Sequence, residues 1–261
     1  MNELLEERDA DGILRLTFNR PDARNAMTFA MYDRLGEIAR EVNADDSIRV
    51  VVLQGAGDKA FIAGTDISQF KAFSKVEDSY AYEDRMEREI GSLAAIRVPT
   101  IAAVRGACTG GGFAIAGACD IRIGSPSARF GIPIARTLGN CLSMASVNLL
   151  IDLLGPARVK EMIFTARLIE APEAKDCGIL QELVDFEDAL APRVDDLAKQ
   201  IAGNAPLTIR AVKEAVRRVM ESRHLDPLAG RDLIAMCYMS ADFREGMSAF
   251  LEKRKPQWQG R

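Results

Sequence analysis

Short apolar runs alternate with longer segments of helical periodicity in the first half of the chain. Four runs are predicted to be strands: 12–18 is strand-like, 49–54 is a β-branched run typical of a buried strand, 100–104 is another buried strand, and 120–123 is a short strand. Apolar residues recur at helical spacing across 28–43 and, with a charged opposite face, across 80–96. A glycine follows three of the strands, at Gly55, Gly106 and Gly124. The pattern predicts repeated strand–turn–helix units.

The second half of the chain is predicted to be helical. Its candidate helices are 143–154, 159–164, 171–177, 186–201, 206–220, 227–240 and 241–253. Pro172 and Pro206 suit the first turn of a helix, whereas Gly155 and Gly178 suit a helix stop. No stretch is long or polar enough to serve as a linker between independent domains.

Composition and charge narrow the class of protein. The 261 residues are 48% hydrophobic and 28% charged, which is enough to bury a core and shape a pocket. A net charge of −4 argues against nucleic-acid binding, although a few local cations could still hold an anionic cofactor. The longest uncharged runs, 106–119 and 137–151, fall short of the roughly 20 residues of a membrane helix. The acidic N-terminus is unlike a signal peptide, so a cytoplasmic protein without membrane contact is expected.

Cysteine and histidine usage also excludes some chemistry. The five cysteines are odd in number and form no CxxC pair, which indicates reduced thiols. A Ser-His-Asp triad or a multi-histidine metal site would need His224, the single histidine, which occupies a polar helix end. We therefore expect His224 at the surface or between helices, catalysis without histidine, and no bound metal.

One candidate site is the turn at 61–67. Gly64 can adopt backbone angles that other residues avoid, and Asp66 can cap the helix that follows. Successive amides of such a turn can point into a pocket. The alternative is an ordinary capped helix start.

A second candidate is the glycine triplet at 110–112, within a segment, 106–118, that is predicted to be a glycine-opened helix. Free N–H groups and the helix dipole favour negative charge there. The alternative is close helix packing. Neither a phosphate loop nor a dinucleotide fingerprint fits the register. Together the two turns fit a two-donor oxyanion hole, in which each donor contributes about 3–4 kcal/mol to transition-state stabilisation.

At these residues the sequence resembles the crotonase superfamily, also called the enoyl-CoA hydratase/isomerase family. The resemblance covers nearly the whole chain. It is carried by motifs at 19–21, 25–26, 63–67, 106–112, 118–122, 130–133 and 245–255.

The resemblance implies an α/β fold, a spiral of repeated ββα units with a C-terminal helical trimerisation region. Residues 1–200 would form the spiral core with the acyl-CoA site, and residues 201–261 would drive oligomerisation and cover the coenzyme A site. The protein would be a homotrimer or a hexamer built as a dimer of trimers. It would have no tightly bound cofactor, since coenzyme A belongs to the substrate, and its setting would be fatty acid metabolism.

The resemblance also implies roles for individual residues. Thr65 and Gly111 would donate the two backbone N–H groups of the oxyanion hole. The coenzyme A set would comprise Ala23 and Arg24 along the phosphates, Ala63, Asp66 and Ile67 beside the adenine and pantetheine, Gly64 and Gly110, and Lys253, which would reach the nucleotide of a neighbouring subunit.

Two positions depart from the family pattern. The hydratases use two glutamates, and this chain has Ala114 and Ile134 in their places. A general acid or base usually contributes about 10²–10⁴-fold to the rate, and neither replacement can move a proton. Isomerases of the family usually keep the second glutamate, so the replacements weaken the isomerase interpretation as well as the hydratase one.

The loop after Pro133 adds candidates for the acyl pocket, Arg136 and Asn140, beside Ala114 and Ile134. A guanidinium there could bind a substrate carboxylate, which would suit a dicarboxylic acyl-CoA or a decarboxylation. The alternative places Arg136 at the surface or a trimer contact. Cys141 as a nucleophile lacks a nearby histidine.

The helix predicted at 80–96 should border the acyl pocket by resemblance. One of its polar side chains could replace the missing acid or base: Tyr82, Glu83, Asp84, Glu87 or Glu89. The alternative for each is a solvated charged face.

Three hypotheses follow. The first is an acyl-CoA enzyme, a lyase or isomerase, that performs hydration, isomerisation, decarboxylation or C–C cleavage. The second is a non-catalytic acyl-CoA binding member that lost the chemistry with its glutamates. The third, a nicotinamide-dependent oxidoreductase, is disfavoured because the fingerprint is missing.

Overall fold

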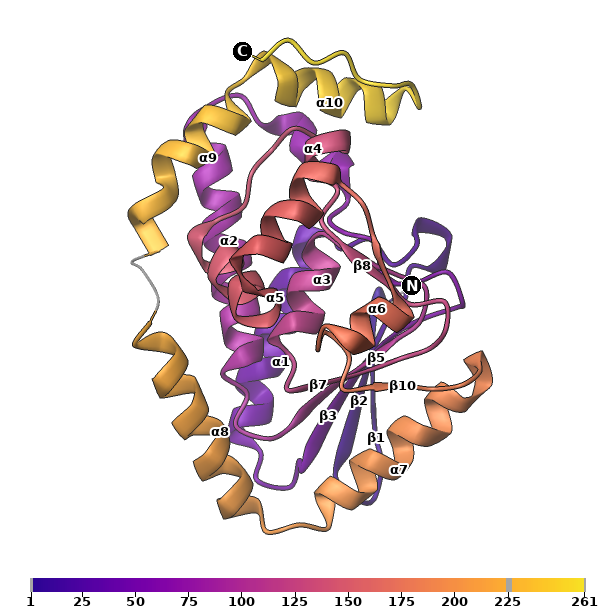
Figure 1. Ribbon diagram of the computed structural model, residues 1–261. Coiled ribbons are helices and arrows are strands. Elements are labelled where there is room, and N and C mark those ends of the chain that lie inside the picture. The colour runs from indigo at the N-terminus through magenta and orange to yellow at the C-terminus, as the bar shows by residue number, and fades with distance from the viewer. Residues whose placement is uncertain (1, 224–226, 261) are drawn as a thin grey trace.

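The computed structural model describes residues 2–223 and 227–260, and its largest sheet has six strands (Figure 1). In spatial order the strands are β1 (Leu4–Arg8), β2 (Ile13–Phe18), β3 (Val50–Gly55), β5 (Thr100–Val104), β7 (Ile121–Gly124) and β10 (Glu182–Leu183). β1 is antiparallel to β2, and the other neighbours are parallel. The four strands predicted from apolar runs are confirmed within a residue or two at their ends. β1 escaped prediction because only Leu4 in it is buried.

The protein has a second, smaller sheet, to which the chain passes after β3, β5 and β7. Its strands are β4 (Ala60–Ile62), β6 (Ala107–Thr109), β8 (Arg129–Gly131) and β9 (Ile169–Glu170). Thus β3, β5 and β7 are each followed by a strand of the second sheet and then by a helix. Those helices are α2 (Val76–Ala94), α3 (Gly111–Ala118) and α4 (Ile134–Thr137). The chain is therefore a mixed α/β fold of three ββα repeats.

The single helix predicted at 106–118 is wrong in its first part. Gly106 (φ +64°) and Gly110 (φ +55°) turn the chain at the two ends of β6. Between them, the backbone of β6 pairs with β4 on one side and β8 on the other. These pairings form between segments far apart in sequence, and they override the local helical tendency.

The remaining helices lie mostly in the second half, as predicted. They are α1 (Phe29–Ala44), α5 (Met144–Thr165), α6 (Ala171–Asp176), α7 (Leu190–Ala202), α8 (Pro206–Glu221), α9 (Arg231–Tyr238) and α10 (Ala241–Leu251), with 3₁₀ turns η1 (Pro21–Ala23), η2 (Ile67–Ala72), η3 (Glu187–Ala189) and η4 (Pro227–Gly230). Gly155 (φ +72°) interrupts α5, which confirms the predicted stop there. No helix in 2–223 or 227–260 combines the length and apolarity needed to cross a membrane.

Apolar side chains of the large sheet form two clusters, one on each face, because they alternate along each strand. Leu14 and Leu16 of β2 pack with α1 and the other central helices. Ile13, on the opposite face, packs with α7 through Val194 and Ala198. Because successive side chains of a strand point to opposite faces, both faces of the sheet are covered.

The C-terminal helices return to the N-terminal half. Residues from η2, α4, α9 and α10 share an apolar cluster: Phe70, Leu138, Ile234, Tyr238 and Phe243. α8 runs along the outside of the molecule in Figure 1, where Lys213 ties it to Asp120 through a 2.6 Å ion pair. α9 and α10 therefore lie over the part of the fold that contains the glycine turns.

Candidate functional site

One cleft of about 710 Å³ gathers most of the predicted site residues, and we call it the main cleft. Its walls come from η1, the turn after β4, and helices α2 to α5, with residues of the C-terminal segment at one side. The predicted residues that line it are Ala23, Arg24, Ala63, Gly64, Thr65, Asp66, Ile67, Gly110, Gly111, Ala114, Ile134, Asn140 and Lys253. The structure brings these residues together, whereas their individual roles stay predictions.

The first glycine turn leaves one amide unused. Met27 N–H donates to the Gly64 carbonyl (2.9 Å), and Asp66 N–H donates to the Met27 carbonyl (2.8 Å). Gly64 has φ +100°, a conformation that glycine adopts readily. The Thr65 N–H between these bonds has no acceptor among the described residues. The turn therefore offers Thr65 N–H to the main cleft.

The Thr65 side chain anchors this turn from behind. Its Oγ1 lies 2.9 Å from the Tyr32 hydroxyl and 3.0 Å from the Tyr82 hydroxyl. Burial raises the pKa of both tyrosines, so the hydroxyls stay protonated. Asp66 caps η2 by accepting from Ser68 N–H at 3.1 Å, which confirms the predicted cap.

The second glycine turn leaves a matching amide. Gly110 N–H is occupied by the Gly131 carbonyl at 3.0 Å. Gly111 is the first residue of α3, and a first-turn N–H has no partner within its own helix. No acceptor for it occurs in the described part of the chain. A Cβ at position 111 would lie 2.2 Å from the Tyr32 hydroxyl oxygen, so glycine is required.

Two cations border the main cleft at its exposed rim. Arg24 and Lys253 both line it and both are exposed. Neither has an ion-pair partner within the described ranges. Nearby, Arg20 forms a 2.9 Å ion pair with Asp66, which neutralises the negative charge of the Asp66 carboxylate. The rim is therefore suited to anionic groups such as phosphates.

A further part of the cleft lining is largely apolar, and we call it the apolar wall. It consists of Phe70, Met86, Ala114, Ile132, Ile134, Leu142, Leu149 and Leu150. Ala114 and Ile134 belong to it and bring no titratable group. Any proton transfer at this wall must use another side chain.

A buried carboxyl group lies beside the apolar wall. Glu83 of α2 lines the main cleft and is 6% exposed. Its Oε1 accepts a 2.6 Å hydrogen bond from the Tyr238 hydroxyl of α9. The Tyr238 oxygen in turn accepts from Asn140 Nδ2 at 3.2 Å. Burial raises the pKa of Glu83 to about 7.

The other candidates on α2 have different surroundings. Tyr82 lines the main cleft but is engaged with Thr65. Asp84 is exposed and pairs with Arg231 at 2.9 Å, and Glu87 does not line the cleft. Glu89 is buried outside the cleft, where Arg88 contacts it at 2.7 Å. A sequence signal for Glu83 existed, because it shares the buried stripe of α2 with Met86 and Ile90.

Arg136, the candidate cation of the acyl pocket, lies away from the main cleft in the single chain. Its side chain is exposed and does not line the main cleft. On α4, Ile134 and Thr137 are three residues apart and face the cleft, which turns Arg136 away. Cys141 does line it, but a hydrogen bond with Cys237 and burial raise the pKa of its thiol, which disfavours a nucleophilic thiolate. His224 lies outside the described residues.

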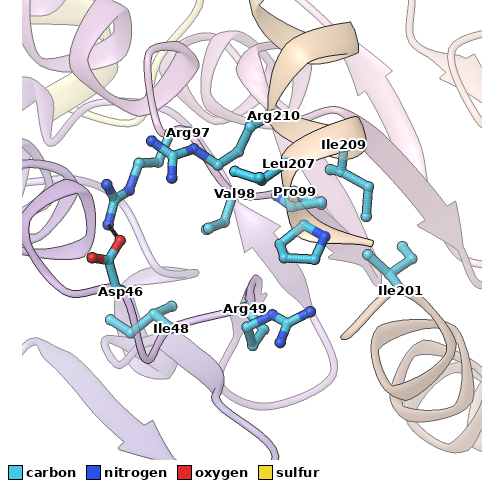
Figure 2. A pocket seen from close by; sticks show the side chains of 11 residues that line it. Asp46, Ile48, Arg49, Arg97, Val98, Pro99, Ile201, Leu207, Ile209 and Arg210 are labelled. Atoms are coloured by element: carbon cyan, nitrogen blue, oxygen red, sulfur yellow. Dashed lines mark hydrogen bonds and ion pairs between the residues drawn. The ribbon is translucent and has the colours of Figure 1, made fainter. Parts of the chain in front are cut away.

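A second pocket, of about 230 Å³, lies apart from both glycine turns. Figure 2 shows it between α8 and the segments that precede β3 and β5. Arg49, Arg97 and Arg210 border an apolar floor, and Arg97 points at Asp46, which it contacts at 2.6 Å. This pocket shares no residue with the main cleft.

Comparison with known proteins shows the family of the chain. Residues 8–261 match the sequence model of the family described as enoyl-CoA hydratase/isomerase. The chain is 33% identical over 256 residues to a short-chain-enoyl-CoA hydratase of Clostridium acetobutylicum, covering 98% of this chain and 97% of the relative. It is 33% identical over 264 residues to a crotonyl-CoA hydratase of Syntrophomonas wolfei, with 97% and 96% covered.

Solved structures extend the likeness to three dimensions. An enoyl-CoA hydratase/carnithine racemase from Magnetospirillum magneticum has a TM-score of 0.81 at 33% identity, covering 100% of this chain and 97% of that one. A methylmalonyl-CoA decarboxylase in complex with 2-nitronate-propionyl-CoA has a TM-score of 0.89 at 29% identity, covering 100% and 99%. The chain belongs to the enoyl-CoA hydratase/isomerase family, within the crotonase superfamily.

Proposed function

We propose that this protein is an enzyme that binds an acyl-coenzyme A thioester in the main cleft and stabilises an enolate-type oxyanion with two backbone N–H groups. The observation that carries the proposal is the pair of amides at Thr65 and Gly111, which border one cleft and have no acceptor in the described chain. A thioester oxygen that gains negative charge would supply the acceptor both amides lack.

The rim of the main cleft supports the choice of ligand. Coenzyme A carries phosphates, and two cations that have no ion-pair partner among the described residues, Arg24 and Lys253, line the cleft. Ala63 and Ile67, which flank the Thr65 turn in sequence, also line the cleft. In this arrangement, Lys253 serves the cleft of its own chain rather than that of a neighbour.

The apolar wall argues against the usual hydration. Positions 114 and 134 are alanine and isoleucine, so neither side chain can orient and activate a water. Reactions that pass through an enolate without adding water suit the cleft better. Isomerisation of an unsaturated acyl group is one, and decarboxylation is the other.

Decarboxylation is supported by one specific likeness. The methylmalonyl-CoA decarboxylase aligns over the whole chain with a TM-score of 0.89. An apolar wall disfavours a substrate carboxylate and would favour its departure as CO₂, which leaves the enolate for the two amides. A single acid near the wall would then complete the reaction by protonating the carbon.

A panel of acyl-CoA thioesters tests the proposed function. Purified protein is incubated with crotonyl-, 3-butenoyl-, dienoyl- and methylmalonyl-CoA, and products are followed by mass spectrometry. Binding of coenzyme A is measured in parallel by calorimetry. We expect isomerisation or decarboxylation with little hydration. Coenzyme A binding without any turnover would instead indicate a non-catalytic acyl-CoA binder, and absence of binding would refute the proposal.

We also propose that the chain forms a homotrimer or a dimer of trimers. α8 and α9 expose apolar side chains in the single chain: Leu207, Val212, Val216, Val219, Leu233 and Met236. Several exposed apolar side chains on one helix are typical of a protein interface. Burial of α8 against a neighbouring copy would also explain why it stands away from its own core (Figure 1).

A further inference from the structure

Glu83 is the one buried carboxyl group among the described residues that line the main cleft. It precedes Met86 of the apolar wall by one helical turn of α2. The backbone N–H of Ser143, which follows Leu142 of the same wall, donates to its carboxyl group. Glu83 is therefore fixed at the wall where the two usual glutamates are missing.

The group is also held from the other side by a hydrogen-bonded chain. Tyr238 donates to Glu83, and Asn140 donates to Tyr238. Asn140 lines the main cleft, and its Oδ1 is buried without a hydrogen-bond partner among the described residues. A buried acceptor without a partner is costly unless a ligand or water supplies a donor. This chain of hydrogen-bonded side chains thus ends at Asn140, a residue that lines the main cleft.

We propose that Glu83 is the proton-transfer residue of this site, with Tyr238 and Asn140 as its positioning residues, an inference that rests on the proposed acyl-coenzyme A function. In the step, the C–H bond at the acyl α-carbon breaks and an O–H bond forms on the Glu83 carboxylate. The electron pair of the C–H bond moves through the thioester to the carbonyl oxygen, which the Thr65 and Gly111 amides hold. If the proton on Glu83 is replaced by a solvent deuteron before it returns to the same carbon, the α-carbon is labelled, and delivery of the proton to the γ-carbon of a β,γ-unsaturated chain gives isomerisation.

The electrostatic surroundings suit a group that both takes and returns a proton. The titratable groups that act on Glu83 come from α1, α2, α9 and the segment before α5: Tyr32, Tyr82, Asp84, Glu87, Tyr238 and Cys141. None of these is a cation, so burial keeps the pKa near 7. A carboxyl group with that pKa can serve as base and acid at neutral pH.

Deuterium exchange measures this step directly. 3-Butenoyl-CoA is incubated with the protein in D₂O, and label at the α-carbon and conversion to crotonyl-CoA are followed by mass spectrometry. We expect exchange with the wild type that weakens below pH 7, and a loss of about 10²–10⁴-fold in Glu83→Gln. Glu83→Asp should recover part of the rate, because it restores a carboxyl group.

The matched control is Glu89→Gln, which changes a buried carboxyl group of the same helix outside the main cleft. It should retain the wild-type exchange rate and coenzyme A affinity. Tyr238→Phe removes a hydrogen bond that lowers the pKa of Glu83, so the inflection of its pH–rate profile should move to higher pH. A merely structural Glu83 would predict no such shift.

The outcomes separate the two proposals. Exchange by Glu83→Gln within about threefold of the wild type at pH 8 overturns the role of Glu83 and leaves the oxyanion function intact. Turnover of the acyl-CoA panel by a wild type that shows no α-carbon exchange also overturns it. Failure of the wild type to bind any acyl-CoA refutes both the proposed acyl-CoA function and the role of Glu83. Coenzyme A affinity of each variant, measured by calorimetry, reports whether it is folded.

Discussion

At the scale of the residue, the site depends on what is absent as much as on what is present. Gly111 has no side chain, which leaves room for the Tyr32 hydroxyl behind it. Ala114 and Ile134 present no titratable group to the main cleft. Glu83 is a carboxyl group on the buried face of α2, and none of the described residues forms an ion pair with it.

Gly111→Ala tests the first of these residues. The new Cβ would lie 2.2 Å from the Tyr32 oxygen, so the Gly111 amide must move. We expect activity on the best acyl-CoA substrate to fall by about 10²–10³-fold, the usual effect of losing one oxyanion donor. Steady-state kinetics measure the loss. The double variant Gly111→Ala with Tyr32→Phe removes the clashing oxygen and should recover part of it, whereas unchanged activity in the single variant would contradict the assigned donor.

Glu83 should also make stability depend on pH. Its pKa is about 7 in the folded protein against an ordinary value of 4.5, so between these values the folded state binds more protons than the unfolded state. The unfolding free energy therefore falls as pH rises through this window, by about 3 kcal/mol from this group. Glutamine does not titrate, so Glu83→Gln lacks this pH-dependent contribution to the unfolding free energy.

Urea unfolding at pH 5 and pH 8 measures the difference. The stability of Glu83→Gln relative to the wild type should increase from pH 5 to pH 8. A constant difference between the two proteins at both pH values would contradict the raised pKa.

At the scale of the element, buried polar links hold the repeats in place. Arg122 of β7 is 4% exposed and donates to carbonyls at the end of α3. Its Nη1 bonds to the Cys119 carbonyl at 2.6 Å, and its Nε bonds to the Ile179 carbonyl at 2.6 Å. The guanidinium thus joins the helix that carries Gly111 to the segment after α6.

Arg122→Met should destabilise the protein by about 3 kcal/mol, because several buried carbonyls lose their donor. Urea denaturation measures the change. Arg129→Met is the control, since Arg129 lies on β8, the next strand along the chain, with an exposed side chain, and it should change stability by less than about 0.5 kcal/mol. Equal effects of the two substitutions would refute this role of Arg122.

Elements were predicted well where the pattern is local. The strand at 100–104 agrees with β5 at both ends, and the helix stop at Gly155 is present. β6 was missed, because it depends on pairing with two other strands. The helix predicted at 227–240 is shorter in the structure, where α9 covers only Arg231–Tyr238.

At the scale of the whole molecule, the surface of α8 is the feature that a single chain does not explain. Val212 and Val216 are 59% and 56% exposed, and α8 contributes no buried residue to its own chain. The proposed trimer would bury this surface. The division into residues 1–200 and 201–261 stays a prediction, although α9 and α10 visibly cover the first part (Figure 1).

Val216→Glu should weaken the assembly by placing a charge in the proposed interface. Light scattering coupled to size-exclusion chromatography should give about three or six times 28.5 kDa for the wild type and a smaller mass for the variant. Arg218→Gln, at a position that is already polar and exposed, should leave the mass unchanged. A wild type that elutes as a monomer would contradict the proposed assembly.

The sequence by itself determined the family, the order of the ββα repeats and the residues of the two glycine turns. Those features are local: glycine conformation, strand composition and capping depend on neighbours along the chain. Only the tertiary structure decided that Glu83 faces the main cleft, because its partner Tyr238 is 155 positions away. Only the tertiary structure turned Arg136 outward and left the Thr65 and Gly111 amides on one cleft without acceptors among the described residues, since both outcomes depend on how distant elements pack.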